Sequence, residues 1–192
     1  MSALVGVLAL QGDFAAHQTL LEAAGVRTRQ VRQASDLEGL DAFLLPGGES
    51  TTISMGIDRE GLREPILEFA KSGRPVFGTC AGLVLMGSEH LGLIDMEVER
   101  NAFGRQIHSF EADITVSGIP DPPVRGVFIR APRVDRVGAN VEVLSEIDGA
   151  IIAVREGNCT AISFHPELVH DARVHALALG LNADALTEMG SP

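Results

Sequence analysis

The stretch RPVFGTCAGLVLM, residues 74–86, decides the fold. Its apolar start at residues 75–77 predicts a buried strand, and the apolar run after Gly82 predicts a helix. Cys80 lies between them, with glycines two positions to either side. This is the thiol version of the G-x-S-x-G nucleophile elbow, a sharp turn that presents its central side chain at the open edge of a sheet. The helix N-terminus would favour the thiolate, and the Ala81 N–H would be placed to stabilise an oxyanion.

The short pattern around Cys80 leaves a second interpretation open, in which the thiol is a small buried hydrophobe. The other cysteine, Cys159, follows a predicted hairpin turn and is assigned to structure. Two cysteines cannot form a disulfide framework, so we expect both to be free thiols in a reducing cytoplasm.

The first 90 residues alternate between apolar runs and segments of helical periodicity. Ser50 or Thr51 is expected to cap the second helix, which runs on through Met55. Because strands that alternate with helices form parallel sheets covered on both faces, we expect ligands at the carboxyl ends of the strands. The predicted strands are 4–10, 26–31, 42–45 and 75–77, and the predicted helices are 14–24, the one after Ser50, and 63–71.

The second half of the chain has a different texture, with short strands joined by turns. Strands are predicted at 96–101, 110–116, 124–130, 141–144, 151–155 and 160–164, with a hairpin turn at 156–158 and a closing helix at 171–189. We therefore expect one domain over residues 1–192. Its fold class is α/β, a flavodoxin-like three-layer α/β/α arrangement with a mostly parallel central sheet and antiparallel strands in the C-terminal half.

The composition excludes several classes of protein. With 45% hydrophobic residues among 192, the chain has ample material for a core. A formal net charge of -11 argues against nucleic acid as a partner, since phosphate binding needs clustered Lys and Arg. No window approaches the ~20 apolar residues of a membrane helix, and the first residues carry no basic leader, so neither a membrane span nor export is expected.

A thiol nucleophile needs a base, and His165 is the candidate among six histidines. It follows an apolar strand directly, and Glu167 two residues later would share its face and hold the imidazole in the required tautomer. Taken alone, the pair also fits a surface histidine with a chance acidic neighbour. A zinc site of His165, Glu167 and His170 is a weaker alternative, because the spacing matches no standard ligand motif. The sequence suggests no partner for His17, His90, His108 or His175.

The third element is PGGESTT, residues 46–52, again at the end of a predicted parallel strand. Its glycines would let the backbone approach a ligand, and its free N–H groups precede a helix, as in an anion cradle. A plain capped turn explains the serine and threonines but leaves the doubled glycine unexplained.

Three separated motifs, GTCAGL (78–83), FHPEL (164–168) and LPGGEST (45–51), are similar to those of the class I, or triad, glutamine amidotransferases. Within that family the chain resembles the glutaminase subunits of pyridoxal 5'-phosphate synthases almost from end to end. The additional segments that carry this closer resemblance are VGVLALQGDF (5–14), VERNAFGRQIHSFEAD (98–113), GVFIRAP (126–132) and VEVLSE (141–146).

The resemblance implies hydrolysis of the glutamine side-chain amide to glutamate and ammonia. It assigns Cys80 as the nucleophile that forms a γ-glutamyl thioester, His165 as the general acid and base, and Glu167 as its orienting group. The oxyanion hole would comprise the N–H groups of Gly48 and Ala81. The resemblance also assigns glutamine binding to Gly48, Glu49, Ser50, Arg100, Ile129 and Arg130.

The resemblance also implies a partner, a TIM-barrel synthase subunit that receives the ammonia for pyridoxal 5'-phosphate synthesis and activates the glutaminase on docking. The glutaminase itself would bind no pyridoxal phosphate and need no metal. The segment 87–92 is shorter than in some relatives, which leaves the local loop shape open. Two alternatives remain: a glutaminase that serves another ammonia acceptor, and a redox-sensing protein of the related flavodoxin-like group in which Cys80 is oxidised.

Overall fold

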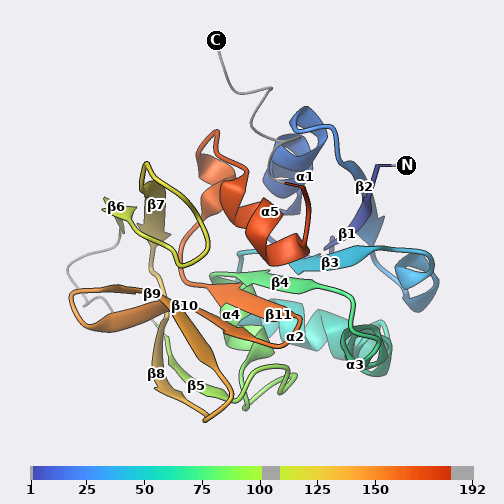
Figure 1. Ribbon diagram of the computed structural model, residues 1–192. Helices are drawn as coiled ribbons and strands as arrows, with labels where there is room; N and C mark the ends of the chain where they lie inside the picture. Colours follow the sequence, from blue (N-terminus) through green and yellow to red (C-terminus); the bar gives the residue numbers. More distant parts are fainter. Residues whose placement is uncertain (1, 101–108, 183–192) are drawn as a thin grey trace.

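The computed structural model describes residues 2–100 and 109–182, and residues 1, 101–108 and 183–192 lie outside its description. A nine-stranded mixed sheet forms the centre of this described part (Figure 1). In spatial order its strands are β2 (Arg27–Val31), β1 (Leu4–Leu8), β3 (Ala42–Leu45), β4 (Val76–Thr79), β11 (Cys159–Ile162), β10 (Ala150–Glu156), β8 (Arg133–Val137) and β5 (Met96–Glu99), with β9 (Glu142–Ile147) paired to β10. The first five are parallel and the others antiparallel, which confirms the predicted mixed α/β sheet.

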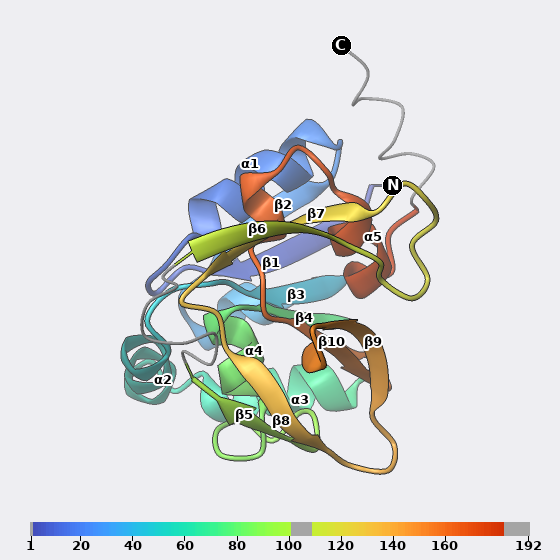
Figure 2. The same ribbon diagram turned by 90° about the vertical axis from the view of Figure 1, so that its left-hand side faces the viewer.

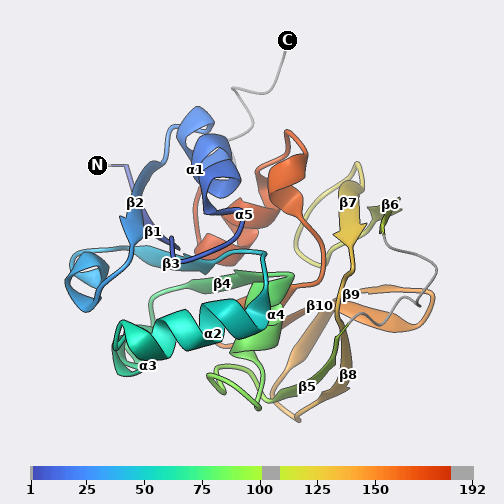
Figure 3. The same cartoon turned by 180° about the vertical axis from the view of Figure 1, so that it is seen from behind.

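Helices cover both faces of the parallel part of the sheet, as Figures 1 and 3 show. Helices α1 (Phe14–Ala23) and α5 (Arg173–Leu179) lie on one face, and α2 (Ser50–Arg59), α3 (Arg63–Lys71) and α4 (Ala81–Met86) lie on the other. Two hydrophobic clusters result, one containing Leu21 and Phe77 and the other Phe43 and Phe69. Because β3 is buried along its whole length, its sequence AFLL is apolar on both faces.

A separate two-stranded sheet, β6 (Ser109–Ile114) with β7 (Val124–Ile129), lies on the same side as α1 and α5 (Figure 2). Phe128 of β7 is fully buried and belongs to the α1–α5 cluster, where its ring centroid lies 5.7 Å from that of Phe164. This contact ties the small sheet to the chain that follows β11.

Several predicted elements agree with the structure almost to the residue. Strand 42–45 and helix 63–71 have the predicted bounds, and the hairpin turn joins β10 to β11 with Glu156 opposite Cys159. Strand β8 was missed. Strand 96–101 ends at Glu99, and its last predicted residue, like His108, lies outside the described residues.

Two predicted helix ends are wrong. Neither Ser50 nor Thr51 caps α2, because the longer side chain of Glu49 accepts from the N–H groups of Thr51 and Thr52 instead. The closing helix ends at Leu179, since Gly180 takes a left-handed conformation with φ 63° and the Leu181 N–H bonds back to the Ala176 carbonyl. Residues 183–189 of that prediction lie outside the described part.

The carboxyl ends of the parallel strands β1, β3, β4 and β11 lie at one edge of the sheet. The segments that follow them contain Gln11, Gly47, Cys80 and His165 in turn. The topology therefore gathers all the predicted motifs at a single place. Within the described ranges, no helix combines the length and apolar character needed to cross a membrane.

Candidate active site

Cys80 occupies a strained turn between β4 and α4. Its φ of 48° lies in a region that L-residues seldom adopt, and its N–H bonds to the Ile162 carbonyl of β11 at 2.8 Å. A Cβ at Gly82 would lie 2.2 Å from the Leu45 carbonyl oxygen, and one at Gly78 would lie 2.7 Å from the Gly82 carbonyl carbon. The glycines are therefore needed for close packing of the elbow, and β4 and β11 hold the thiol between them.

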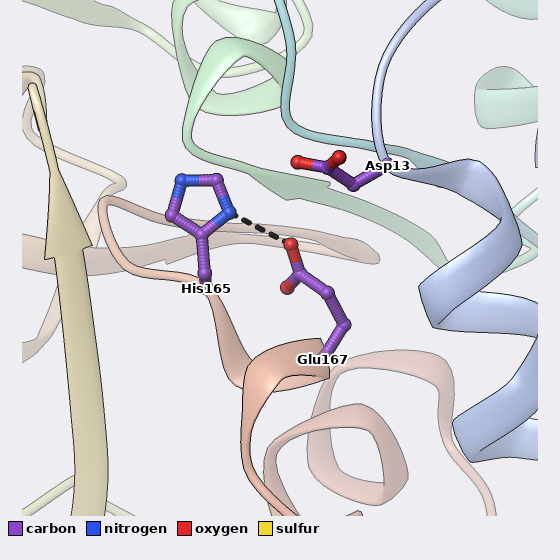
Figure 4. Close-up of side chains that lie close together, drawn as sticks. All are labelled: Asp13, His165 and Glu167. Atoms are coloured by element: carbon purple, nitrogen blue, oxygen red, sulfur yellow. Dashed lines mark hydrogen bonds and ion pairs between the residues drawn. The ribbon is translucent and has the colours of Figure 1, made fainter.

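His165 and Glu167 lie in the turn after β11 (Figure 4). The His165 Nδ1 and Glu167 Oε1 atoms are 2.7 Å apart, and the His165 N–H donates to the Val127 carbonyl at 2.8 Å. The predicted contact is present, but its predicted basis was wrong. Glu167 belongs to a 3-10 helix, Pro166–Leu168, so a tight turn rather than strand alternation brings the carboxylate back to the ring.

The surroundings of His165 favour its protonated form. Burial lowers the pKa of the ring, but the side chains of Cys80 and Glu167 outweigh it and raise the pKa to about 10. Because the carboxylate side chain of Glu167 is fully buried, its interaction with the imidazole is not screened by water. The site is thus suited to hold a protonated imidazole beside Cys80.

The doubled glycine of the loop after β3 is explained by contacts on both sides. A Cβ at Gly47 would lie 2.7 Å from His165 Cε1 and 3.6 Å from Cys80 Cβ. A Cβ at Gly48 would lie 2.6 Å from Gln11 Oε1 and 2.9 Å from Gly12 Cα. The loop therefore packs its bare backbone directly against the reactive pair, a closeness that no larger residue permits.

A cavity of about 330 Å³ opens in front of Cys80 and His165. This is at the small end of the range for ligand pockets, ~300 to 1,000 Å³. The lining includes all the predicted site residues except Glu167, which lies behind the imidazole. It consists of Gln11, Asp13, Gly48, Glu49, Ser50, Cys80, Ala81, Val84, Arg100, Ile129, Arg130, Pro132 and His165.

Two arginines give the cavity a cationic rim. Arg100 reaches Glu49 Oε1 at 3.2 Å, and Arg130 has a φ of 43°, the same uncommon backbone region as Cys80. Of the three non-glycine residues with positive φ in the described chain, Cys80 and Arg130 both line this cavity. Backbone strain is therefore concentrated at the site.

The carboxylate of Glu49 is already engaged. It accepts from the N–H groups of Thr51 at 3.1 Å and Thr52 at 2.7 Å, and the Thr52 hydroxyl and these backbone donors lower its pKa to about 2. Its own N–H donates to Gln11 Oε1 at 2.8 Å. Gln11, which the sequence did not single out, thus fixes the loop that carries Gly48. Its only sequence signal was its place at the end of the first strand.

Asp13, His165 and Glu167 each offer a possible metal ligand, and the three atoms lie within 4.8 Å of one another (Figure 4). His170 is exposed and does not join this group, so the predicted zinc set of His165, Glu167 and His170 is not assembled in the described structure. The direct bond between His165 Nδ1 and Glu167 Oε1 commits both groups to each other.

Two histidines without a predicted partner lie behind Glu167. His17 of α1 and His175 of α5 are fully buried, and His17 Nδ1 lies 2.9 Å from His175 Nε2. On its other side His17 Nε2 lies 3.5 Å from Glu167 Oε2. The contact joins residues 158 positions apart, and no local sequence signal announces it.

Comparisons with known proteins show the family to which the chain belongs. A model of the SNO glutamine amidotransferase family matches residues 7–180. A pyridoxal 5'-phosphate synthase subunit PdxT from Niallia circulans is 52% identical, covering 94% of this chain and 98% of its own length. One from Streptomyces avermitilis is 51% identical, with 91% of each chain covered. A crystal structure described as a glutamine amidotransferase superposes with a TM-score of 0.87 at 43% identity, covering 92% of this chain and 97% of that one.

Proposed function

Because the chain belongs to the SNO glutamine amidotransferase family, we propose that it is the glutaminase subunit of a pyridoxal 5'-phosphate synthase. It hydrolyses L-glutamine to L-glutamate and supplies the ammonia for vitamin B6 biosynthesis. One observation carries the mechanism: a strained elbow thiol, an imidazole bonded to a buried carboxylate, and a glycine loop meet at one small cavity.

In the first half of the reaction Cys80 attacks the side-chain carbonyl carbon of glutamine. The electron pair of the C=O bond moves to oxygen, and the N–H groups of Gly48 and Ala81 stabilise that oxyanion. Ala81 is the first residue of α4, so its N–H has no partner within the helix. His165 gives its proton to the amide nitrogen, the C–N bond breaks, and ammonia leaves a γ-glutamyl thioester on Cys80.

In the second half His165, now neutral, takes a proton from water as the water oxygen attacks the thioester carbon. The C–S bond breaks, glutamate leaves, and the proton on His165 restores the thiolate–imidazolium pair. Glu167 keeps the Nδ1 proton of His165 in place throughout, so that Nε2 remains free to exchange protons at the cavity.

Glutamine is proposed to bind along the rim of the cavity. Arg100 and Arg130 supply positive charge for the α-carboxylate, and a carboxylate is recognised well by guanidinium groups. Ser50 and Ile129 line the same wall, and Glu49 contributes mainly by fixing α2 and Arg100.

The proposed partner is the TIM-barrel synthase subunit, which receives the ammonia, and the chemistry assigned to this chain uses no cofactor of its own. An alternative acceptor for the ammonia is disfavoured by the 52% and 51% identity to subunits named for pyridoxal phosphate synthesis. A redox sensor is disfavoured by the His165–Glu167 pair, because a sensing thiol needs no acid–base relay.

Glutamate release from L-glutamine in the presence of the synthase subunit tests the proposal. Cys80→Ala should abolish release. The matched control is Cys159→Ala, which removes the other buried thiol of the chain. Cys159 lies on β11, and its variant should retain activity. Equal activity of the two variants would overturn the assignment of the nucleophile.

The same assay without the synthase subunit tests activation by docking. We expect release to rise when the partner is added. An unchanged rate would contradict activation while leaving the triad assignment intact.

A further inference from the structure

A buried chain of polar side chains continues from Glu167 into the core. Glu167 Oε2 faces His17 Nε2 at 3.5 Å, the same nitrogen lies 3.2 Å from Thr79 Oγ1, and His17 Nδ1 lies 2.9 Å from His175 Nε2. His17, Thr79 and His175 are all 0% exposed. They come from α1, β4 and α5, three elements that meet behind the reactive pair.

We infer that His17 is a positioning residue for the triad: its Nε2–H group faces the second oxygen of Glu167, and His175 fixes the His17 tautomer that makes this possible. The His17 Nε2–H group donates its hydrogen bond to Thr79 Oγ1 at 3.2 Å. At 3.5 Å from Glu167 Oε2, the same N–H group acts on the carboxylate as an adjacent dipole. Glu167 is then bonded to His165 at Oε1, and its Oε2, which has no hydrogen-bond partner in the described part of the chain, faces the N–H dipole of His17.

The hydrogen-bonding inventory and the facing carboxylate together decide the tautomers. If His17 carried its proton on Nδ1, the lone pair of Nε2 would face the carboxylate of Glu167, and His175 would have to accept at Nε2 and carry its own proton on Nδ1. His175 Nδ1 has no hydrogen-bond partner among the described residues, so that arrangement would leave a buried donor unpaired. The opposite arrangement leaves His175 Nδ1 as an unpaired acceptor and frees the Thr79 hydroxyl proton, so donors alone do not separate the two. The carboxylate does, because only the opposite arrangement turns an N–H group rather than a lone pair toward Glu167 Oε2.

The favoured arrangement is therefore a one-way relay. His175 Nε2–H donates to His17 Nδ1, His17 Nε2–H faces Thr79 and Glu167, and His165 Nδ1–H donates to Glu167. Burial, with His175 and His165 nearby, holds the pKa of His17 well below its ordinary value, and burial lowers that of His175 to about 3. Both inner rings are thus neutral, which the relay requires.

The inference rests on the proposed glutaminase reaction only for its kinetic consequence. His17→Leu removes both ring nitrogens, whereas His17→Gln places an amide N–H₂ near the position of Nε2. With the synthase subunit present, His17→Leu should lower kcat about 10- to 100-fold, as loss of an outer partner of a catalytic histidine commonly does. KM for glutamine should change less than about 2-fold, since His17 does not line the cavity.

His17→Gln should recover most of that kcat, and His90→Leu, a histidine outside this cluster, should match the wild type. Equal loss in the leucine and glutamine variants, or a change in KM alone, would overturn the positioning role. Thermal unfolding of each variant shows whether it is folded.

Nitrogen-15 NMR of the ring nitrogens tests the relay without any substrate or partner. In the wild-type chain His17 and His175 should each be neutral and protonated at Nε2. Protonation of His17 at Nδ1 would overturn the inference even if the glutaminase assignment holds. Conversely, if Cys80→Ala remained active, the proposed reaction would fail while the tautomer result stood.

Discussion

The two sides of the His165 imidazole have opposite surroundings. One side faces the cavity, where Cys80, the Gly48 backbone and exposed arginines meet. The other faces Glu167, His17 and the side chains behind them, all cut off from solvent. In the proposed reaction, charge appears and disappears on the cavity side as oxyanions form and decay. The carboxylate side carries one constant charge, so it can be dry and closely packed.

The same comparison appears in the three buried histidines. Burial lowers the pKa of each ring, yet the pKa of His165 is raised to about 10 while that of His175 falls to about 3. The difference is that His165 lies between Cys80 and Glu167, which both favour its proton, whereas His175 has only the charge of Asp171 in its favour. Hydrogen bonding to both Cys80 and Glu167 therefore separates the reactive histidine from the supporting ones.

The largest effect is expected from filling the space between the cavity loop and the ring. Gly47→Ala places a methyl group 2.7 Å from His165 Cε1, so the imidazole must shift from its present position beside Cys80. Because a displacement of about 1 Å can cost 100-fold in rate, we expect glutamate release with the synthase subunit to fall by at least about 100-fold.

The control for that variant is Gly56→Ala. Gly56 lies inside α2, where an added Cβ would meet only the side chain of Leu10, 3.1 Å from its Cδ1 and 3.6 Å from its Cβ. Its activity should stay near that of the wild type. Full activity in Gly47→Ala would show that the ring tolerates movement on its cavity side, against the close packing described above.

Much of the parallel half was predictable because its buried strands are continuous apolar runs bounded by glycine or proline. Strand 42–45 shows this agreement, and helix 63–71, which ends before Ser72-Gly73, also has its predicted bounds. Strand β8 was missed because Arg133 and Arg136 interrupt its apolar residues. Those arginines pair across to Glu99 and Glu97 of β5, a match that only the strand register shows.

The cavity side of the site was similarly visible in sequence, since Cys80, His165 and Gly48 each follow a strand that ends at the same edge. The supporting side was not. His17 sits in α1 and His175 in α5 with nothing local to mark either, and they meet only because both helices pack on one face of the sheet. Contacts created by packing between distant helices leave no spacing pattern to find.

The next largest effect concerns stability against acid. His175 is fully buried beside His17, with Asp171 the nearby acidic group. Since its pKa is about 3 in the folded chain against an ordinary 6.5, the unfolded chain binds its proton first as the pH falls. Its contribution to stability is complete above pH ~6.5 and is lost as the pH drops toward ~3, amounting to about 2 kcal/mol between pH 7 and 5.

His175→Gln should remove that contribution, so the free energy of unfolding in urea should decline less steeply between pH ~7 and ~5 than in the wild type. The exposed His170→Gln is the control, and its decline should match the wild type. Identical slopes for all three proteins would mean that burial does not lower the pKa of His175. The region behind Glu167 would then be accessible to water.

The smallest effect tests whether a buried polar atom two residues before His165 lacks a hydrogen-bond partner. Ser163 is 0% exposed, and its hydroxyl has no hydrogen-bond partner in the described part of the chain. Ser163→Ala removes the desolvated hydroxyl at little cost in volume, so the free energy of unfolding should stay equal or rise by up to about 1 kcal/mol. Ser145 is the matched control, because its buried hydroxyl donates to the Thr115 carbonyl at 2.7 Å and Ser145→Ala should lower stability by about 1 kcal/mol. A loss in Ser163→Ala as large as in Ser145→Ala would instead show that the Ser163 hydroxyl is hydrogen-bonded in solution.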